Sequence, residues 1–308
     1  MDVLYKYRSF SERTDEIILD KKVWLAKPST LNDPFECQLE RFDEEKLKKY
    51  IEDSKEWQYF GFLANALLCK DKKLNFYGIE GRKLRIFLNR LEKLKTLQQR
   101  YEFANKLMVK SGVGSFTDPT QDARSLHIQL GNVGIFSLSE DPANMQMWSH
   151  YGDSHKGVAL GFSKEKSSKL SNRKYCREIH YKNDMSEFDF AGESMAALEI
   201  GFDNSGRLIK QSSIPLDDPQ VQNAMFTKTT GWEYEKEWRY LEYKYGSYDF
   251  PGPLTEVIFG LSANPDNIKK FIELCKNNID YDIQFKRIVR VQGSTELKVV
   301  DFLERIEA

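Results

Sequence analysis

Alternating apolar and polar residues predict strands at both ends of the chain. Residues 3–10 (VLYKYRSF) alternate and are rich in residues that favour strands, and Ser11 can cap a short helix before the pattern resumes. The runs at 133–138 and 156–162 are short and apolar, as in buried strands that could be neighbours. The predicted strands are 3–10, 21–28, 133–138, 156–162, 174–181, 235–243, 255–261, 284–291 and 296–302.

Helical spacing of apolar residues replaces this alternation between about residues 43 and 130. GRKLRIFLNRLEKL, for example, places apolar residues three and four positions apart between charges. Further helices are predicted around SMAALEIGF (194–202) and over 264–278, where Pro265 lies near the first helical position. We therefore expect a single α+β domain over residues 1–308, with a central mixed or antiparallel β-sheet and a mainly helical insertion at about 43–130.

Composition and charge narrow the classes of protein to consider. The 46 Lys and Arg residues nearly balance 47 Asp and Glu, so no global field favours nucleic acid or membrane, although a local basic groove remains possible. Cys37, Cys69, Cys176 and Cys275 are widely spaced, which argues against a disulfide framework or a zinc site. Without a signal peptide or a membrane-spanning apolar run, we expect a cytoplasmic protein with no membrane contact and no bound metal.

The first predicted strand carries two cations on one face. Alternation places Lys6 and Arg8 on one side and Tyr5 and Tyr7 on the other. Two cations on one face can bind phosphate, and arginine adds a planar fork of donors. A solvated outer face is the competing interpretation.

The stretch LNDPFE (31–36) has the residues of a turn. Asn32, Asp33 and Glu36 together offer carboxylate and amide oxygens, which suit a hard cation. Asn and Asp also bond their own backbone, and proline ends a regular element. Since no second ligand group has matching spacing, a structural turn is the favoured interpretation.

The stretch MWSHYGDSHKGVALGF (147–162) places aromatic and histidine side chains just before an apolar strand. Trp148 and Tyr151 fall on one face of a short helix. His150 and His155 could act as general acid or base near neutral pH. The alternative is that these histidines are structural.

The stretch 228–243 (KTTGWEYEKEWRYLEY) is the strongest candidate for a site. If 235–243 is one strand, Glu235, Glu237 and Arg239 share a face. Such a row is costly to bury unless the charges are paired. The surrounding aromatic residues favour a cleft, and a structural ion-pair network is the rival interpretation.

Four motifs in order resemble a known family. LYKYRSF, LNDPFE, MWSHYGDSHKGVALGF and TGWEYEKEWR are similar to the bacterial family catalogued as domain of unknown function 2971. The motifs span most of the chain. The family name implies no chemistry.

The order of parts is also similar to that of small ADP-ribosyltransferase-like domains, which include bacterial nucleic-acid-modifying toxins. This resemblance implies NAD as a co-substrate, with Arg8 on its nicotinamide-ribose or phosphate side and Tyr151, with Trp148, stacked on nicotinamide. Glu237, or Glu235 in a shifted register, would be the late-strand glutamate. The expected catalytic residues are Glu237, Glu235, His155 and Arg239, and the expected cofactor-binding residues are Lys6, Arg8, Trp148, Tyr151 and Lys228.

The chain departs from the pattern of those domains in three ways. It lacks a clear Ser-Thr-Ser triplet, Glu235-Lys236-Glu237 only mimics the usual Glu-x-Glu loop, and the helical block is long. Glu256 is an alternative late-strand glutamate.

Three functions remain as hypotheses. The first is an NAD-dependent ADP-ribosyltransferase-like enzyme, such as a toxin or antiphage-defence effector, that modifies nucleic acid or protein. The second is a phosphodiesterase or nuclease, and the third is a non-catalytic nucleotide- or partner-binding module. A nucleic-acid acceptor would use a local groove of Lys6, Arg8, Lys228 and Arg239, and the hydrolase would use Asp33, Glu36, Glu235, His150 and His155.

Overall fold

The structure is a computed structural model of the 308-residue chain, in which two compact units are distinguished. The first unit comprises Met1–Leu39, Gln129–Phe188 and Ile214–Ala308, and the second comprises Glu40–Ile128 and Asp189–Ser213. The second unit begins near the expected insertion and also takes in residues 189–213. The structure describes residues 3–37, 44–183, 197–202, 208–213 and 215–302.

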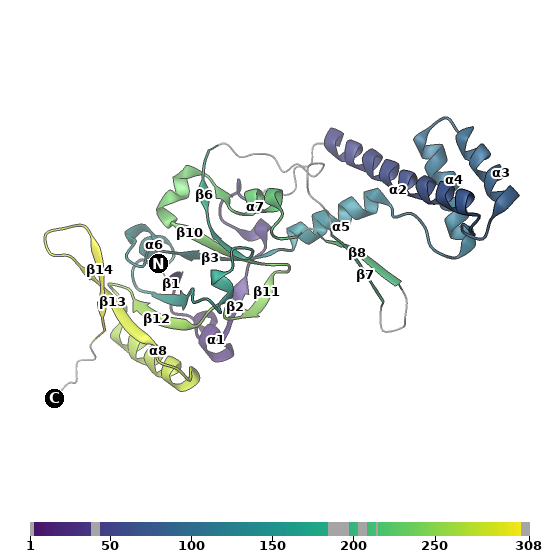
Figure 1. The fold of residues 1–308 in the computed structure, drawn as a ribbon. Coiled ribbons are helices and arrows are strands. Elements are labelled where there is room, and N and C mark those ends of the chain that lie inside the picture. Colours follow the sequence, from purple (N-terminus) through teal and green to yellow (C-terminus); the bar gives the residue numbers. More distant parts are fainter. Residues whose placement is uncertain (1–2, 38–43, 184–196, 203–207, 214, 303–308) are drawn as a thin grey trace. The chain divides into compact units, whose positions relative to one another are not determined.

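A mixed sheet forms the centre of the first unit (Figure 1). Its strands are β1 (Val3–Arg8), β3 (Gly134–Ser139), β4 (Val158–Ser163), β5 (Cys176–Glu178), β10 (Glu237–Glu242), β12 (Leu254–Phe259), β13 (Gln284–Arg290) and β14 (Leu297–Asp301). Among the described residues these eight pair in the order β14-β13-β12-β4-β1-β3-β10-β5. Only β12 and β13 run parallel within this described set. The predicted α+β class with a mixed central sheet is confirmed.

Strand β1 lies between β3 and β4, so the expectation that these two apolar strands are neighbours is wrong. β1 pairs with β4 from Val3 to Arg8, whereas its described pairing with β3 is limited to Tyr5 and Ser139. Apolar runs reveal burial but not which strand lies beside which. The short pairing leaves a backbone carbonyl of β3 available to a side chain of β1, as the site below shows.

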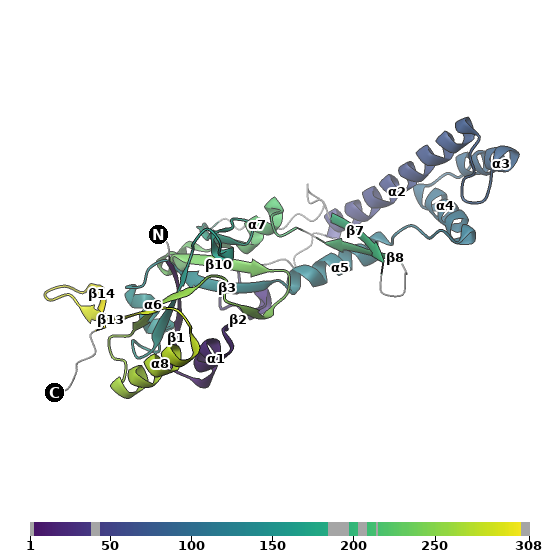
Figure 2. The same ribbon diagram turned by 60° about the horizontal axis from the view of Figure 1, so that its bottom comes forward.

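The two faces of the sheet are covered differently (Figures 1 and 2). On one face, α1 (Glu12–Asp20) and α8 (Pro265–Asn278) pack on a core that includes Leu4, Phe136 and Leu160. On the other face, Tyr5 and Tyr7 pack with residues of α6 (Met145–His150). The predicted alternation along β1 is thus confirmed.

Smaller elements complete the first unit. β2 (Lys22–Leu25) pairs with β11 (Gly246–Asp249), and β6 (His180–Tyr181) runs parallel to β9 (Thr227–Lys228). The remaining helices are η1 (Pro28–Thr30), η2 (Lys169–Ser171), α7 (Pro219–Met225) and η3 (Thr230–Glu235).

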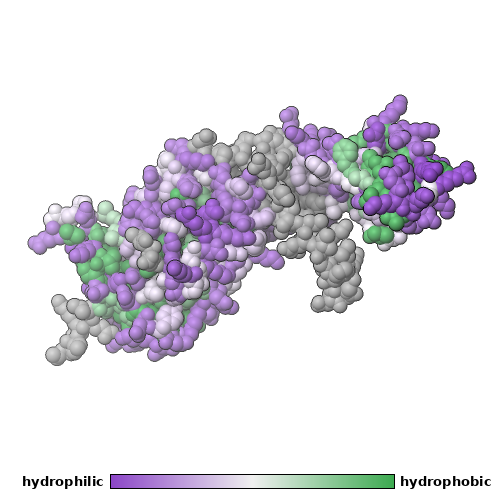
Figure 3. All heavy atoms as spheres, viewed as in Figure 1, coloured by the Kyte–Doolittle hydropathy of each residue, from purple (hydrophilic) through white to green (hydrophobic). Residues whose placement is uncertain are grey.

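The second unit is mainly helical, as its apolar spacing predicts. Its helices are α2 (Glu44–Lys72), α3 (Gly81–Glu92), α4 (Leu97–Ser111) and most of α5 (Pro119–Gly131). An aromatic-rich core forms where Phe62 contacts Phe76 and Phe87. Some apolar side chains of α2, such as Trp57 and Phe60, remain exposed, and Figure 3 shows apolar residues gathered on this unit.

The second unit also contains a hairpin that the sequence did not predict. β7 (Ala197–Phe202) pairs antiparallel with β8 (Leu208–Ser213), so the expected helix over 194–202 is wrong where the chain is described; residues 194–196 lie outside the described part. Alanine, methionine and glutamate favour a helix, but the apolar residues at 198, 200 and 202 follow the period of a strand.

Among the helices in the described part of the chain, none is long and apolar enough to cross a bilayer.

Candidate functional site

Three carboxylates and two cations are buried together at the start of β10. Glu237 opens this strand, and Arg239 lies two positions further on the same face. Glu235 ends η3, Lys228 ends β9, and Glu36 comes from the turn after η1. The exposed fractions are 5% for Glu36, 4% for Glu235, 4% for Glu237, 2% for Lys228 and 0% for Arg239. Because buried charges are costly unless paired, their pairing decides what the cluster can do.

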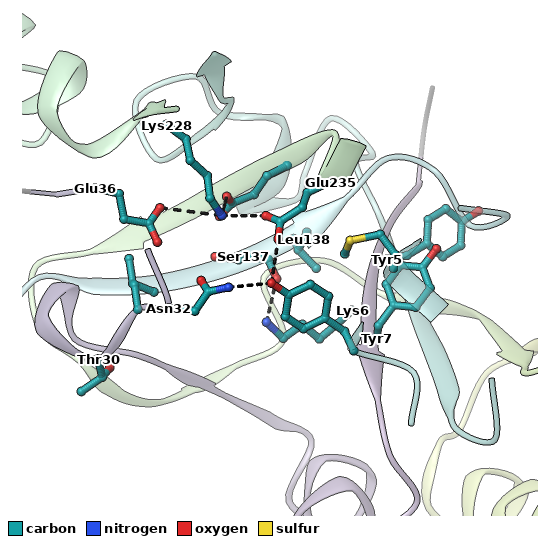
Figure 4. A pocket seen from close by; sticks show the side chains of 14 residues that line it. Tyr5, Lys6, Tyr7, Thr30, Asn32, Glu36, Ser137, Leu138, Lys228 and Glu235 are labelled. Atoms are coloured by element: carbon teal, nitrogen blue, oxygen red, sulfur yellow. Dashed lines mark hydrogen bonds and ion pairs between the residues drawn. The ribbon is translucent and has the colours of Figure 1, made fainter. Parts of the chain in front are cut away.

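The ammonium group of Lys228 bridges the three acids (Figure 4). Its Nζ lies 2.6 Å from Glu235 Oε2, 3.1 Å from Glu237 Oε2 and 3.8 Å from Glu36 Oε2. It also lies 4.7 Å from the centre of the Trp232 ring, so an aromatic face covers its remaining side.

The guanidinium of Arg239 forms a bidentate ion pair with Glu237. Nε lies 2.7 Å from Glu237 Oε1 and Nη2 lies 3.2 Å from Oε2. Nη2 also donates to Glu36, and Nη1 donates to the carbonyl of Met225 at 2.7 Å. This fork fixes the carboxylates in one geometry.

A backbone kink at Lys236 separates two acids that the sequence placed on one strand. Lys236 has a φ of 44°, in the left-handed region, and it ends η3. The strand therefore begins at Glu237, and the expected continuous strand over 235–243 is wrong at its first two residues. Glu235 and Glu237 still meet, because both bind Lys228. Their shared contact with Lys228, rather than a common strand face, therefore brings the two acids together.

The cluster shifts the proton affinities of its members in different directions. Burial acts to raise the pKa of Glu237, but the charges of Arg239 and Lys228 outweigh it and lower this pKa to about 2. For Glu36 burial wins over the same two cations, and its pKa is raised. Burial acts to lower the pKa of Lys228, yet Glu237 and the other acids raise it. Glu237 is therefore ionised at neutral pH, and Glu36 retains a proton more readily than an exposed glutamate.

A pocket of about 250 Å³ opens over this cluster. Figure 4 shows its walls, which come from β1, β3, the turn after η1, α6 and the charged cluster. Its lining is made of Tyr5, Lys6, Tyr7, Thr30, Leu31, Asn32, Glu36, Ser137, Leu138, Met147, Tyr151, Lys228, Glu235 and Glu237. Five expected site residues are therefore brought together, namely Lys6, Tyr151, Lys228, Glu235 and Glu237.

The end of α6 delivers Tyr151 to the pocket. Asn144 caps the helix through its side chain, which accepts from the backbone of Met147. Tyr151, which follows the last residue of the helix, donates its hydroxyl to Glu235 Oε1 at 2.6 Å and accepts from Asn32 Nδ2 at 2.7 Å. Burial, followed by the bond to Glu235, raises the pKa of Tyr151. The tyrosine therefore stays protonated and joins two walls.

Lys6 reaches the pocket from β1. Its Nζ donates to the carbonyl of Ser137 at 2.8 Å, on the stretch of β3 beyond the described β1–β3 pairing. Burial, followed by the charge of Arg8, lowers the pKa of Lys6 to about 8, despite the opposing effects of Glu237 and Glu235. Lys6 is still mainly a cation at neutral pH and is the pocket's candidate for holding an anionic group.

The other expected site residues lie elsewhere. Trp148 is completely buried in the core, packs against Tyr7 and donates its indole N–H to the carbonyl of Pro142 at 2.8 Å. A side chain with no exposed surface cannot stack on nicotinamide, so that expectation is corrected. Arg239 lies behind Glu237, beneath the pocket lining rather than in it.

Arg8 and His155 lie at the far end of β1 and β4 rather than in the pocket lining. Each has a buried side-chain nitrogen, Arg8 Nε and His155 Nδ1, without a hydrogen-bond partner among the described residues. Burial, then Arg290, lowers the pKa of His155. Lys228 and Arg239 do not contribute to the local groove expected for nucleic acid. Both side chains are buried in ion pairs rather than exposed to phosphates.

Two parts of the candidate site were harder to find from the sequence. Glu36 and Asn32 belong to a stretch read as a structural turn, although it follows a predicted strand end, where functional groups gather.

The alternative glutamate, Glu256, lies on β12 and binds Tyr5 and Lys286. Its position outside the pocket lining removes it from this site.

In the described ranges no group of three or more histidine, cysteine, aspartate or glutamate side chains is arranged to hold a metal ion. Lys228 occupies the space among the three clustered acids.

Comparison with known proteins gives one match. Neither the curated proteins nor the solved structures include a match to this chain. A family model described as protein of unknown function (DUF2971) matches residues 147–240, from α6 into β10. This segment holds Tyr151, Lys228, Glu235 and Glu237, and its match supports the resemblance to that family carried by the motifs.

Proposed function

We propose that the protein is an NAD-consuming, ADP-ribosyltransferase-like enzyme. The observation that carries the proposal is Glu237, an ionised carboxylate in the wall of a small pocket, held by Arg239 and Lys228. The resemblance to ADP-ribosyltransferase-like domains also supports it, since a strand with basic residues opens the chain and a late strand begins with a glutamate.

The chemistry follows from where charge develops. As the bond between nicotinamide and ribose breaks, its electron pair leaves with nicotinamide and the ribose ring becomes cationic. A fixed carboxylate next to that ring stabilises the developing charge without having to reorganise. Glu237 would supply this charge, and Glu235 would assist from the opposite side of Lys228.

Other pocket residues would orient the substrate. Lys6 would bind a phosphate of NAD, because it is a half-buried cation of the lining whose ammonium group donates to the backbone carbonyl of Ser137. Tyr151 would lie along the nicotinamide end. The acceptor of the ADP-ribosyl group would be a nucleic-acid base, a protein side chain or water, as in a toxin or defence effector.

The test is nicotinamide release from NAD by purified wild-type protein, with RNA, DNA or cell lysate as acceptors. We expect Glu237→Gln to lower the rate by about 10²- to 10³-fold, the scale for removing one preorganised electrostatic group. Glu256→Gln, in a carboxylate network on the same sheet but outside the pocket lining, should retain the rate. Circular dichroism and thermal melts establish that each variant is folded.

The result also separates the alternative functions. Retained turnover in folded Glu237→Gln would remove Glu237 from this role. No release under any condition, combined with nucleic-acid cleavage that a chelator stops, would favour a nuclease. Stabilisation by nucleotide without turnover would favour a binding module.

A further inference from the structure

One oxygen of Glu36 is buried in the pocket wall without a hydrogen-bond partner in the described part of the chain. The side chain is 1% exposed, and its Oε2 receives Arg239 and lies 3.8 Å from Lys228. Its Oε1 has no hydrogen-bond partner among the described residues. Glu36 also lines the pocket, and Figure 4 shows it facing Lys228 across from Asn32.

An unpaired buried oxygen of this kind calls for a physical explanation. Leaving a buried acceptor unsatisfied costs about 1–3 kcal/mol, and more for a charged group. Other carboxylate oxygens in the cluster are satisfied, since both oxygens of Glu235 and both of Glu237 have partners. A ligand that donates a hydrogen bond to Glu36 would remove this cost on binding.

The cations nearest to Glu36 favour a neutral donor. Lys228 and Arg239 already face Glu36, and Lys6 lines the same pocket. A ligand ammonium or guanidinium bonded to Glu36 would lie beside these cations, which already supply its positively charged partners. A hydroxyl group donates without adding charge, and Glu237 offers a second acceptor on the far side of Lys228 for a neighbouring hydroxyl.

We propose that the pocket recognises a ribosyl group and that Glu36 Oε1 accepts a hydrogen bond from one of its hydroxyls. The proposal rests on the proposed function, because it takes the ribosyl group as the part of the substrate in this pocket. The volume agrees, since about 250 Å³ lies just below the roughly 300 Å³ lower bound of sites for drug-sized ligands and suits a nucleoside rather than a whole dinucleotide. Glu36 is thus a specificity-determining residue.

The test is a calorimetric comparison of nicotinamide riboside and adenosine with their 2′-deoxy and 3′-deoxy analogues, and with nicotinamide alone. We expect the wild type to bind a riboside about 10- to 100-fold more tightly than the analogue that lacks the contacted hydroxyl, the scale of a hydrogen bond to a charged group. Glu36→Ala should bind both within about threefold, because the acceptor is gone.

Two further variants keep the result interpretable. Glu36→Gln preserves the shape, and its carbonyl must face Arg239, so a donor replaces the acceptor in the pocket and the discrimination should also fall. Glu256→Gln should keep full discrimination. Thermal melts identify any variant that is unfolded. If one of the two Glu36 variants is unfolded, the discrimination measured for the other one tests the role of Glu36.

Every outcome separates this proposal from the NAD-consuming activity. Discrimination that persists in folded Glu36→Ala, or that the wild type lacks, overturns the role of Glu36 even if NAD is consumed. Equal binding of nicotinamide and its riboside overturns it in favour of a carboxamide donor, and no binding of any riboside overturns it outright. Glu36-dependent discrimination without NAD consumption supports the ribosyl site and rejects the proposed reaction.

Discussion

Two carboxylate networks on the same sheet differ in one respect. Glu256 on β12 has both oxygens bound, one by the Tyr5 hydroxyl at 3.0 Å and the other by Lys286 at 2.8 Å. In the network around Glu237, by contrast, Glu36 keeps one buried oxygen unpaired among the described residues. The first network is closed at the edge of the core, and the second is incomplete beside a pocket.

This difference helps to distinguish a structural ion-pair network from a candidate functional site. Both networks pair acids with lysine, so charge pairing alone does not distinguish them. An unsatisfied buried atom on a residue that lines a pocket does, because native proteins satisfy nearly all buried polar groups. Four predictions test this comparison.

The largest expected effect is on stability. Arg239→Met removes one of the two cations that Glu237 and Glu36 share in a buried site, and we expect the free energy of unfolding to fall by about 3–5 kcal/mol. Lys286→Met removes a partly exposed partner and should cost about 1 kcal/mol or less. Urea denaturation measures both. Equal losses would show that the two networks are energetically alike.

The next largest effect is the loss of stability at acidic pH. The pKa of Glu237 is about 2 in the folded protein and about 4.3 in an unfolded chain, so its ionised form stabilises the fold above pH 4.3. That stabilisation disappears as the pH falls through 4.3 towards 2. We expect the wild type to lose stability in this window more steeply than Glu237→Gln, by up to about 1.4 kcal/mol per pH unit. Parallel profiles in denaturation experiments would contradict the assignment.

A smaller effect is expected on the alkaline side. Lys6 has a pKa of about 8, so it is cationic below that pH and loses its charge above it. If Lys6 holds a phosphate, ADP-ribose should bind roughly tenfold more weakly at pH 9 than at pH 7. Lys6→Arg should remove this dependence, since arginine stays charged. Calorimetry across the pH range would reject the role if the two proteins behave alike.

An effect of similar size is expected at the hydrogen bond between Tyr151 and Glu235. Tyr151→Phe keeps the ring but removes a donor to one acid and an acceptor for Asn32. We expect the free energy of unfolding to fall by about 1–2 kcal/mol, in the range for losing buried hydrogen bonds. Tyr5→Phe, which removes the matching bond to Glu256, is the control in the closed network. A larger loss in the control would reverse the ranking of the two networks.

Prediction from the sequence worked where the signal was local. Alternation located β1 and the placement of Lys6 opposite Tyr5 and Tyr7, and helical spacing located α6 and Tyr151. It failed where the signal depended on distant partners. Trp148 looked like a binding residue because of its neighbours in sequence, yet the core of the sheet surrounds it.

The sequence alone indicated most of the strands and helices, because the 2.0 and 3.6 periods of burial can be read from neighbouring positions. It assigned the wrong element to 197–202. It also determined that 228–243 carries charges that must be paired if buried. Only the tertiary structure decided that β1 separates β3 from β4, and that Glu36 joins Glu237 through Arg239. Those two acids are 201 positions apart in the chain, and contacts over such distances follow from the packing of whole elements rather than from local pattern.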